Sequence, residues 1–261
     1  MERKRLSPFV FGLTMLFFYL PLVLLMLFSF NEAKTMIWQA FSFRWYEELF
    51  MNSGMLWRAF GFSVLIAVAS STLACVLGAA GAVALHWYDF HGRRYLKFVT
   101  YLPLIIPDII MGVSLLIFFA AVHFNLGLQT IFIAHTTFSV PFVLFILLAR
   151  LEEFDDSVIE ASRDLGAGEF YTLRRVIIPM LLPGIISGFL MSMTLSLDDF
   201  VITFFVSGPG SSTLPLHIYS MLRFGVSPVI NALSVIMIAV TVLLTLMSKN
   251  VQKYMIGRQK A

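Results

Sequence analysis

Six apolar stretches, each long enough to cross a lipid bilayer, are the feature that most constrains how this chain folds. A membrane-spanning helix needs about 20 predominantly apolar residues. The stretches cover residues 9–30, 59–85, 98–122, 126–149, 180–206 and 229–248. Lipid offers no hydrogen-bond partner to the backbone, so a segment of this kind satisfies its N–H and C=O groups by forming a helix. The sequence therefore predicts an all-α membrane protein with six transmembrane helices.

The composition supports this class and excludes others. Of the 261 residues, 59% are hydrophobic and 13% are charged, whereas a soluble domain carries about 25% charged residues. The single cysteine, Cys75, lies within an apolar stretch and has no second cysteine to pair with, so redox chemistry is not expected. Basic loops explain the net charge of +3 better than nucleic-acid binding does.

The basic residues also predict the orientation. When loops are assigned between the six stretches, 14 of the 18 Lys and Arg residues fall on one side. By the positive-inside rule this side is cytoplasmic, and both termini lie there. We expect a first helix with its outer loop (residues 1–58), a core of transmembrane helices (residues 59–248) and a cytoplasmic tail (residues 249–261). No small-residue cleavage site follows the first stretch, so we expect it to be retained as an anchor.

The inner loop over residues 150–179 is the most polar part of the chain. Ser157 and Glu160 have the S-x-x-E spacing of a capping box, which predicts the start of a helix. Gly166 can adopt the left-handed conformation that ends a helix, and a second helical segment is expected to run up to Pro179 at the membrane. The spacing alone fits both an ordinary solvated loop helix and a rigid docking element.

Three aspartates interrupt the apolar stretches: Asp108 in the third, and Asp198 and Asp199 in the fifth. A carboxylate at the centre of a spanning helix costs about 2.5–3.5 kcal/mol, which predicts a wet cavity, a partner or protonation. A route lined by carboxylates favours cations. Neighbouring helical residues point in different directions, so Asp198 and Asp199 are not expected to face one pore together. Pairing of Asp108 with His135 in the fourth stretch is the structural alternative.

Small residues recur every fourth position in the fifth stretch, at Gly184, Gly188, Ser192 and Ser196. Such a stripe lets a neighbouring helix approach closely, and here it leads onto the expected face of Asp199. We therefore predict a substrate path that includes Asp108, Asp198, Asp199 and Ser196.

The loop resembles a known motif. Glu160-Ala161-Ser162, then Gly166, then Val-Ile-Ile-Pro at residues 176–179 are similar to the EAA motif of permease subunits of ABC importers. The resemblance implies a type I ABC importer permease fold and a loop that inserts into a groove on a cytoplasmic ATPase. It assigns the ATPase coupling to Glu160, Ala161, Ser162, Asp164, Gly166 and Pro179. No glycine begins a G-x-x-x-x-G-K-[ST] motif, so ATP is expected to be used by a partner subunit, and no cofactor or metal is expected in this chain.

The C-terminal third narrows the family. Residues 195–210, 213–221 and 224–233, with Asn31 and Trp45 near the first stretch, resemble the second membrane subunit of spermidine/putrescine ABC transporters. This implies polyamine import across the bacterial inner membrane by alternating access, without covalent chemistry. The implied partners are a homologous permease subunit, two ATPase subunits and a periplasmic polyamine-binding protein. The expected outer gate or receptor contact comprises Ser207, Gly208, Pro209, Gly210 and Tyr219.

Two other classes remain as alternatives. An ion-coupled secondary transporter of small organic cations would also carry intramembrane acids, but usually shows paired inverted repeats. An intramembrane enzyme is disfavoured because the sequence holds no H-E-x-x-H, no G-x-S-x-G and no metal-ligand cluster of His and Cys.

Overall fold

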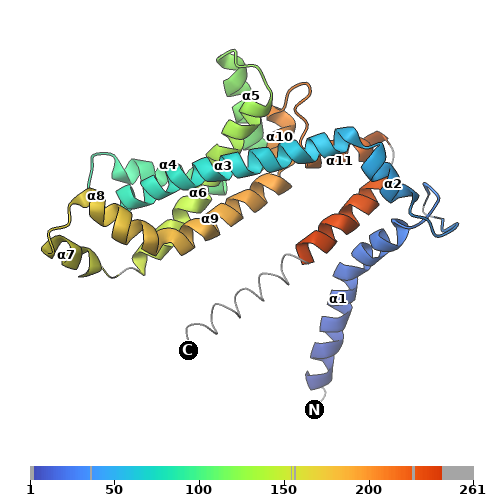
Figure 1. Ribbon diagram of the computed structural model, residues 1–261, viewed down its shortest axis with the longest axis horizontal. Helices are drawn as coiled ribbons and strands as arrows, with labels where there is room; N and C mark the ends of the chain where they lie inside the picture. The colour runs from blue at the N-terminus through green and yellow to red at the C-terminus, as the bar shows by residue number, and fades with distance from the viewer. Residues whose placement is uncertain (1–2, 36, 154, 156, 225–226, 243–261) are drawn as a thin grey trace. The chain divides into compact units, whose positions relative to one another are not determined.

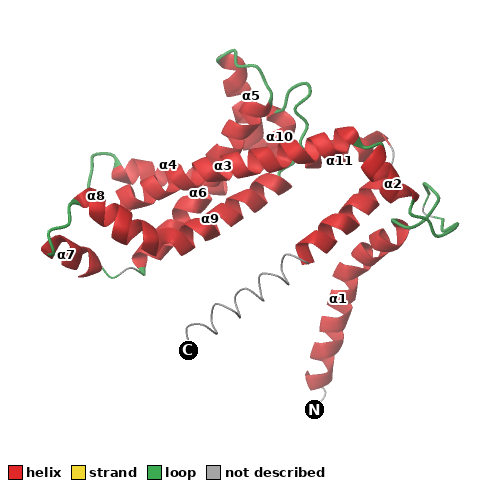
Figure 2. Cartoon of the chain, viewed as in Figure 1, coloured by secondary structure: helices red, strands yellow, loops and turns green. Residues whose placement is uncertain are grey.

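The computed structural model describes residues 3–35, 37–153, 155, 157–224 and 227–242 (Figure 1). These residues form helices, loops and turns (Figure 2), with one isolated antiparallel bridge between Asn31 and Phe41. The all-α prediction is therefore confirmed. The chain divides into two compact units: the first comprises the segments Met1–Met55 and Ile218–Ala261, and the second is Leu56–His217.

The described residues contain four helices long and apolar enough to span a membrane. They are Pro8–Phe28, Gly54–Trp87, Leu128–Glu152 and Glu169–Asp198. Two further helices, Arg93–Ile105 and Asp108–Ala121, together form a fifth candidate span that is bent by 114°. The apolar helix Pro228–Val242 covers the first part of the expected sixth span. The rest of that span and the expected tail, residues 243–261, lie outside the described residues.

In the first unit, Asn31 organises the loop between helices α1 (Arg3–Phe28) and α2 (Arg44–Met51). The Asn31 side-chain NH2 donates hydrogen bonds to two loop carbonyls, those of Thr35 at 3.1 Å and Ile37 at 2.9 Å. Its main-chain carbonyl accepts a 2.6 Å hydrogen bond from the indole N–H of Trp45, which is buried. Both residues named by the family resemblance in this region thus serve to fix the loop.

Three long helices pack together in the second unit: α3 (Gly54–Trp87), α6 (Leu128–Glu152) and α9 (Ile178–Asp198) (Figure 1). A Cβ atom added to Gly188 would lie 3.2 Å from Val143 Cγ1, and one added to Gly78 would lie 2.8 Å from the same atom. The glycine stripe of α9 and a glycine of α3 therefore let both helices pack closely on α6, as predicted for the stripe. The apolar cluster at this contact comprises Ala74, Cys75, Ala82, Val143, Leu147, Leu151, Ile159, Ile177 and Leu181.

A second apolar cluster packs helix α5 (Asp108–Ala121) against α6 and the short helix α10 (Val201–Val206). It comprises Ile66, Met111, Phe119, Ile131, Ala134, Phe138, Ile202 and Val206. Because α5 follows the bend after α4 (Arg93–Ile105) and α10 follows the end of α9, this packing brings two helix breaks together.

The cytoplasmic loop predicted from the sequence forms helix α7 (Ser157–Asp164) and the single turn α8 (Glu169–Thr172). A π-helical turn, Leu173–Ile177, then leads into α9 without interruption. The expectation that the second segment stops at Pro179 is therefore wrong. Proline has no N–H to donate to the preceding turn, and the wider π-turn just before it accommodates the loss within a continuous helix.

Candidate functional site

The fifth predicted span is interrupted at its two aspartates. Helix α9 ends at Asp198, Asp199 has extended backbone angles, and α10 starts at Val201. The sequence reading of one continuous helix over residues 180–206 is wrong here. The apolar pattern on both sides of the break is unchanged, so hydrophobicity does not reveal it.

Asp199 caps the N-terminus of α10. Its Oδ1 accepts the N–H of Ile202 at 3.2 Å, and its Oδ2 accepts the N–H of Thr203 at 2.8 Å and the Thr203 hydroxyl at 2.7 Å. A carboxylate that accepts the first N–H groups of a helix satisfies donors with no intrahelical partner. Asp199 therefore stabilises the start of α10 and defines the break.

His135 on α6 is the other partner of Asp199. Its ring is fully buried, and Nε2 lies 3.2 Å from Asp199 Oδ2 and 2.9 Å from the Thr203 hydroxyl. On the opposite edge of the ring, Nδ1 lies 2.6 Å from the hydroxyl of Ser196. The alternative pairing of His135 with Asp108 is thus wrong, because the ring is already engaged by α9 and α10.

Asp108 is the first residue of α5, directly after the bend at Ile106 and Pro107. The prediction that Asp108 lies inside a continuous third span is therefore wrong. Pro107 lacks the N–H that a continuous helix would use, and the two helices meet there at 114°. At this position the partial positive charge of the helix N-terminus favours the Asp108 carboxylate.

A cavity of about 380 Å³ lies between the two breaks and is partly open to the surface. Asp108, Asp198 and Asp199 all line it, so the expectation that Asp198 and Asp199 face different ways is wrong; the helix ends between them and the helical periodicity no longer applies. Ser196 is buried and does not line the cavity. The remaining wall is mainly apolar: Pro103, Leu104, Ile106, Met111, Phe138, Phe142, Thr194, Leu195, Phe200, Val201 and Ile202.

The three carboxylates differ in exposure and in the number of hydrogen bonds they make. Asp108 and Asp198 are exposed, and neither makes a side-chain hydrogen bond or ion pair with another described residue. Asp199 is half-buried and accepts the hydrogen bonds given above. The cavity therefore offers two unengaged carboxylates beside one that is held by the protein.

The end of α7 has the geometry predicted for Gly166. Its φ is +81°, its N–H donates to the carbonyl of Arg163 at 2.8 Å, and the Ala167 N–H donates to the carbonyl of Ser162 at 3.1 Å. These two bonds define a Schellman motif, for which glycine is the preferred residue. The helix stop is thus confirmed.

The start of α7 differs in detail from the predicted capping box. Ser157 is the first helical residue, and the Asp155 carboxylate accepts its N–H at 3.0 Å. Hydrogen bonds from Ser157 hold the pKa of the Asp155 carboxyl below its usual value. An acceptor two residues before Ser157 therefore takes over the capping role expected of the Ser157 hydroxyl.

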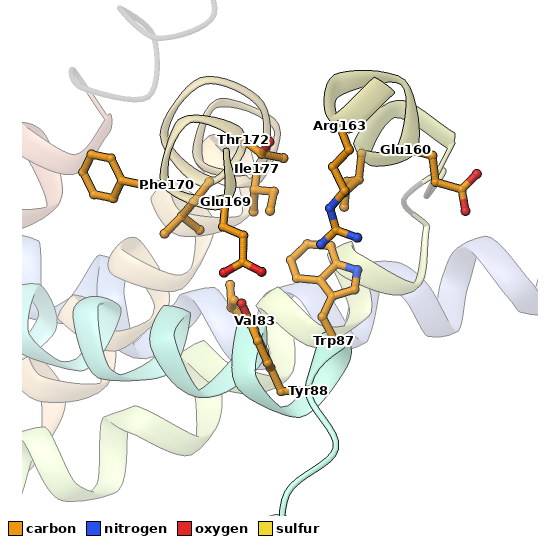
Figure 3. Close-up of a pocket in the computed structure, with 11 residues that line it drawn as sticks. Val83, Trp87, Tyr88, Glu160, Arg163, Glu169, Phe170, Thr172 and Ile177 are labelled. Atoms are coloured by element: carbon orange, nitrogen blue, oxygen red, sulfur yellow. The ribbon is translucent and has the colours of Figure 1, made fainter. Parts of the chain in front are cut away.

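A pocket of about 480 Å³ lies between the loop and the end of α3. Figure 3 shows Arg163 and Glu169 directed toward Trp87 and Tyr88, and Glu160 lies at the side of the same pocket, whose lining it shares. Ser162 and Thr172 hydroxyls are 3.1 Å apart and join α7 to α8. The loop is thus tied together by this contact, and Glu160 stays exposed to solvent.

The outward surface of the loop is unusually apolar for a loop. Leu165 is 89% exposed and Phe170 75% exposed, and Tyr171, Ala161, Asp164 and Pro179 are exposed as well. Large exposed apolar side chains next to charged residues are typical of a protein interaction surface.

The segment after α10 contains a tight turn. The Ser211 hydroxyl donates to the Gly208 carbonyl at 2.7 Å and accepts the Gly208 N–H at 2.8 Å, and Gly210 has a φ of +76°. Pro209 and Gly210 are exposed, while Ser207 and Gly208 are half-buried. Tyr219, on helix α11 (Leu214–Phe224), is 44% exposed.

Gly208→Ala is expected to destabilise the protein. A Cβ atom there would lie 2.0 Å from the Leu126 carbonyl oxygen, and backbone cannot move aside as a side chain can. Overpacking of this kind costs about 1–3 kcal/mol or more, so we expect less assembled protein in membranes and a lower melting temperature. Gly61→Ala, inside α3 with open space around it, is the matched control. Equal thermal stability of the two variants would contradict the close approach.

A match to a protein family identifies the class of protein to which this chain belongs. The family described as "Binding-protein-dependent transport system inner membrane component" matches residues 74–260. This chain belongs to that family. It is a transmembrane permease subunit of an ABC importer in the inner membrane, it is not an enzyme, and ATP is hydrolysed by a partner ATPase. Membership excludes the secondary transporter and the intramembrane enzyme.

Curated relatives cover almost the whole chain. The spermidine/putrescine transport system permease protein PotC of Haemophilus influenzae is 41% identical over 234 residues, which are 89% of this chain and 91% of the relative. The putrescine transport system permease protein PotI of Escherichia coli is 41% identical over 230 residues, covering 85% and 82% of the two chains. A putative 2-aminoethylphosphonate permease, PhnV of Salmonella choleraesuis, is 27% identical over 248 residues, covering 93% and 92%.

Solved structures share the fold. A bacterial ABC transporter that imports the acidic polysaccharide alginate matches with a TM-score of 0.73 at 16% identity, covering 94% of this chain and 95% of the other. The MetNI methionine ABC transporter, in an inward-facing conformation, matches with a TM-score of 0.63 at 22% identity, covering 77% and 97%. The expected importer permease architecture is therefore confirmed at the level of the fold.

Sequence reasoning missed Thr203 and named the wrong aspartate as the partner of His135. A hydroxyl four residues after Asp199 is compatible with a helix cap, and this weak signal is the one the sequence offers for Thr203. The contact from His135 to Asp199 joins residues far apart in the chain, and no local pattern indicates it.

Proposed function

We propose that this chain is the permease subunit through which an ATP-driven importer moves linear polyamines such as spermidine or putrescine. The observation that carries the proposal is the cavity in which three aspartates stand among mainly apolar walls. A polyamine has ammonium groups separated by methylene segments. At an effective dielectric of about 20, one carboxylate and one ammonium about 4 Å apart attract by about 4 kcal/mol, and the apolar walls cover the methylenes.

The lining favours a cation over an anion. Among the described residues that line this cavity there is no Lys, Arg or His. A phosphonate or a carboxylate cargo would meet three acidic side chains and no basic one. The chain's greater identity to polyamine permeases than to the 2-aminoethylphosphonate permease agrees with this preference.

We further propose the assembly in which the chain works. Six spans would place both termini in the cytoplasm, beside a homologous permease subunit, two ATPase subunits and a periplasmic polyamine-binding protein. The ATPase contact would be the outward surface of the loop, with Glu160, Leu165 and Phe170. The turn at residues 207–210 and Tyr219 would form the outer gate or receptor contact.

In this scheme the chain alternates between outward and inward access. The π-turn and α9 form one continuous helix from the loop to Asp198. A displacement of the loop by the ATPase would therefore be transmitted along α9 to the helix break at the cavity, which requires no other moving part within this chain.

The test is transport by the reconstituted complex. The chain is purified with its partner permease, ATPase and binding protein and placed in liposomes. We expect uptake of labelled spermidine or putrescine that requires ATP and is not inhibited by 2-aminoethylphosphonate. Uptake without ATP hydrolysis would contradict the coupling, and inhibition by the phosphonate but not by polyamines would contradict the cargo.

A further inference from the structure

We infer that His135 is a positioning residue that sets the cation site by holding Asp199, and that Asp199 serves as a helix cap rather than as a cargo ligand. The inference rests on the proposed function for its cargo and on the geometry of four side chains: His135, Asp199, Thr203 and Ser196. His135 lies on α6, Ser196 on α9 and Thr203 on α10, and Asp199 lies in the break between α9 and α10; both of these helices pack on α6.

The directions of the hydrogen bonds determine which nitrogen of the His135 ring carries a proton. The Thr203 hydroxyl donates to Asp199 Oδ2 at 2.7 Å, because a carboxylate oxygen only accepts. That hydroxyl has no second hydrogen, so in its 2.9 Å contact with His135 it accepts, and Nε2 carries the proton. His135 Nε2 also lies 3.2 Å from Asp199 Oδ2. On the opposite edge, Nδ1 is within hydrogen-bond distance of the Ser196 hydroxyl.

These contacts occupy most of the positions at which the Asp199 carboxylate can accept a hydrogen bond. Its two oxygens accept three hydrogen bonds, from the Ile202 N–H, the Thr203 N–H and the Thr203 hydroxyl, and Oδ2 also lies 3.2 Å from His135 Nε2. A carboxylate accepts about four hydrogen bonds in all. Asp199 therefore has little left to offer an ammonium group, whereas its neighbour Asp198 is exposed at the same cavity.

The arrangement also explains how Asp198 reaches the cavity. Asp198 ends α9, and its direction depends on where α10 begins. Asp199 sets that beginning, and His135 ties Asp199 to α6 while tying Ser196, one turn earlier, to the same ring. Loss of the ring contact on the Asp199 side would release the break and move Asp198, although His135 does not line the cavity.

Two substitutions separate this role from simple packing. Glutamine places an N–H near the position of Nε2 and so keeps the contact to Thr203 and Asp199. Asparagine is shorter, so its amide can contact the Ser196 hydroxyl but not Thr203 or Asp199. We expect His135→Gln to retain polyamine uptake within about threefold, and His135→Asn to raise the KM for uptake about 10-fold, the effect of losing a hydrogen bond to a charged group. His123→Asn is the matched control, because His123 lies in an exposed loop at a φ of 53° that asparagine tolerates.

Asp199 itself supplies the second test. If His135 acts through Asp199, the double variant H135N/D199N will be no worse than D199N alone, since residues in one network do not contribute independently. If H135N does not assemble, the same role is tested by comparing Thr203→Val with Thr203→Ser. Serine keeps the hydroxyl and valine keeps the shape, so we expect the valine variant alone to raise the KM.

A cargo-independent readout distinguishes this inference from the proposed function. Asp198→Cys is labelled with a thiol reagent in the assembled complex, where the native Cys75 is buried. We expect H135N, but not H135Q, to change the labelling rate. If the wild type takes up no polyamine, the proposed function fails while the labelling still tests His135. If the labelling rates and the KM values of H135N and H135Q are the same, the inference is wrong.

Discussion

Replacing Asp108 and Asp198 together by asparagine is expected to lower polyamine uptake at least about 100-fold, because each carboxylate pairs with one ammonium at about 4 kcal/mol and tenfold corresponds to about 1.4 kcal/mol. Both side chains are exposed at the cavity, and neither is engaged by another described residue. Asparagine keeps the shape and removes the charge. The measurement is ATP-dependent uptake of labelled spermidine in proteoliposomes at several cargo concentrations.

The loss should fall mainly on KM, since the charge attracts cargo rather than reacting with it. Asp89→Asn is the matched control. Asp89 lies in the loop between α3 and α4, where it pairs with Arg93, and an exposed pair of this kind contributes at most about 1 kcal/mol. Normal uptake by the double variant, at normal levels of assembled complex, would show that the cargo does not bind in this cavity on its way through the protein.

The features that followed from the sequence are those that local chemistry sets. Long apolar stretches require helices in lipid, and four of the expected spans are found as long helices. Gly166 was identified because few residues other than glycine accept a positive φ at a helix end, and its φ of +81° agrees. The stripe from Gly184 to Ser196 predicted a close helix contact for the same kind of reason, and all four of its small residues are buried.

The positions of the breaks in the helices could not be predicted from the sequence. Pro103 and Pro107 indicated some distortion near Asp108, but a bend of 114° depends on how α5 packs against α10. At Asp199 the chain has neither glycine nor proline, and the break is stabilised by His135, 64 positions earlier in the chain. Because the candidate cavity lies between these two breaks, its shape follows from tertiary packing, while its acidic character could be read directly from the residues.

Gly166→Pro is expected to uncouple the transporter, with ATP-dependent uptake reduced at least about 10-fold while the complex still assembles. Proline requires a φ near −65° and has no N–H, whereas Gly166 has a φ of +81° and donates to the carbonyl of Arg163. The Schellman motif cannot form, so the last turn of α7 unwinds and the outward positions of Glu160 and Leu165 are lost. Gly166→Ala removes less, since a Cβ at positive φ costs about 1–2 kcal/mol, and should reduce uptake by an intermediate amount.

Gly168→Ala provides the matched control for this series. A Cβ at Gly166 or at Gly168 would meet no atom within 4 Å, and the two positions differ in backbone angle, because Gly168 has a φ of −72°. Any difference between the two alanine variants therefore reports the left-handed turn and not crowding. Measuring ATP hydrolysis beside uptake locates the defect: hydrolysis that continues without uptake places it in transmission from the ATPase to α9. If Gly166→Pro transports as well as Gly168→Ala, the loop does not transmit the motion, and the route from the ATPase to the cavity runs through another part of the complex.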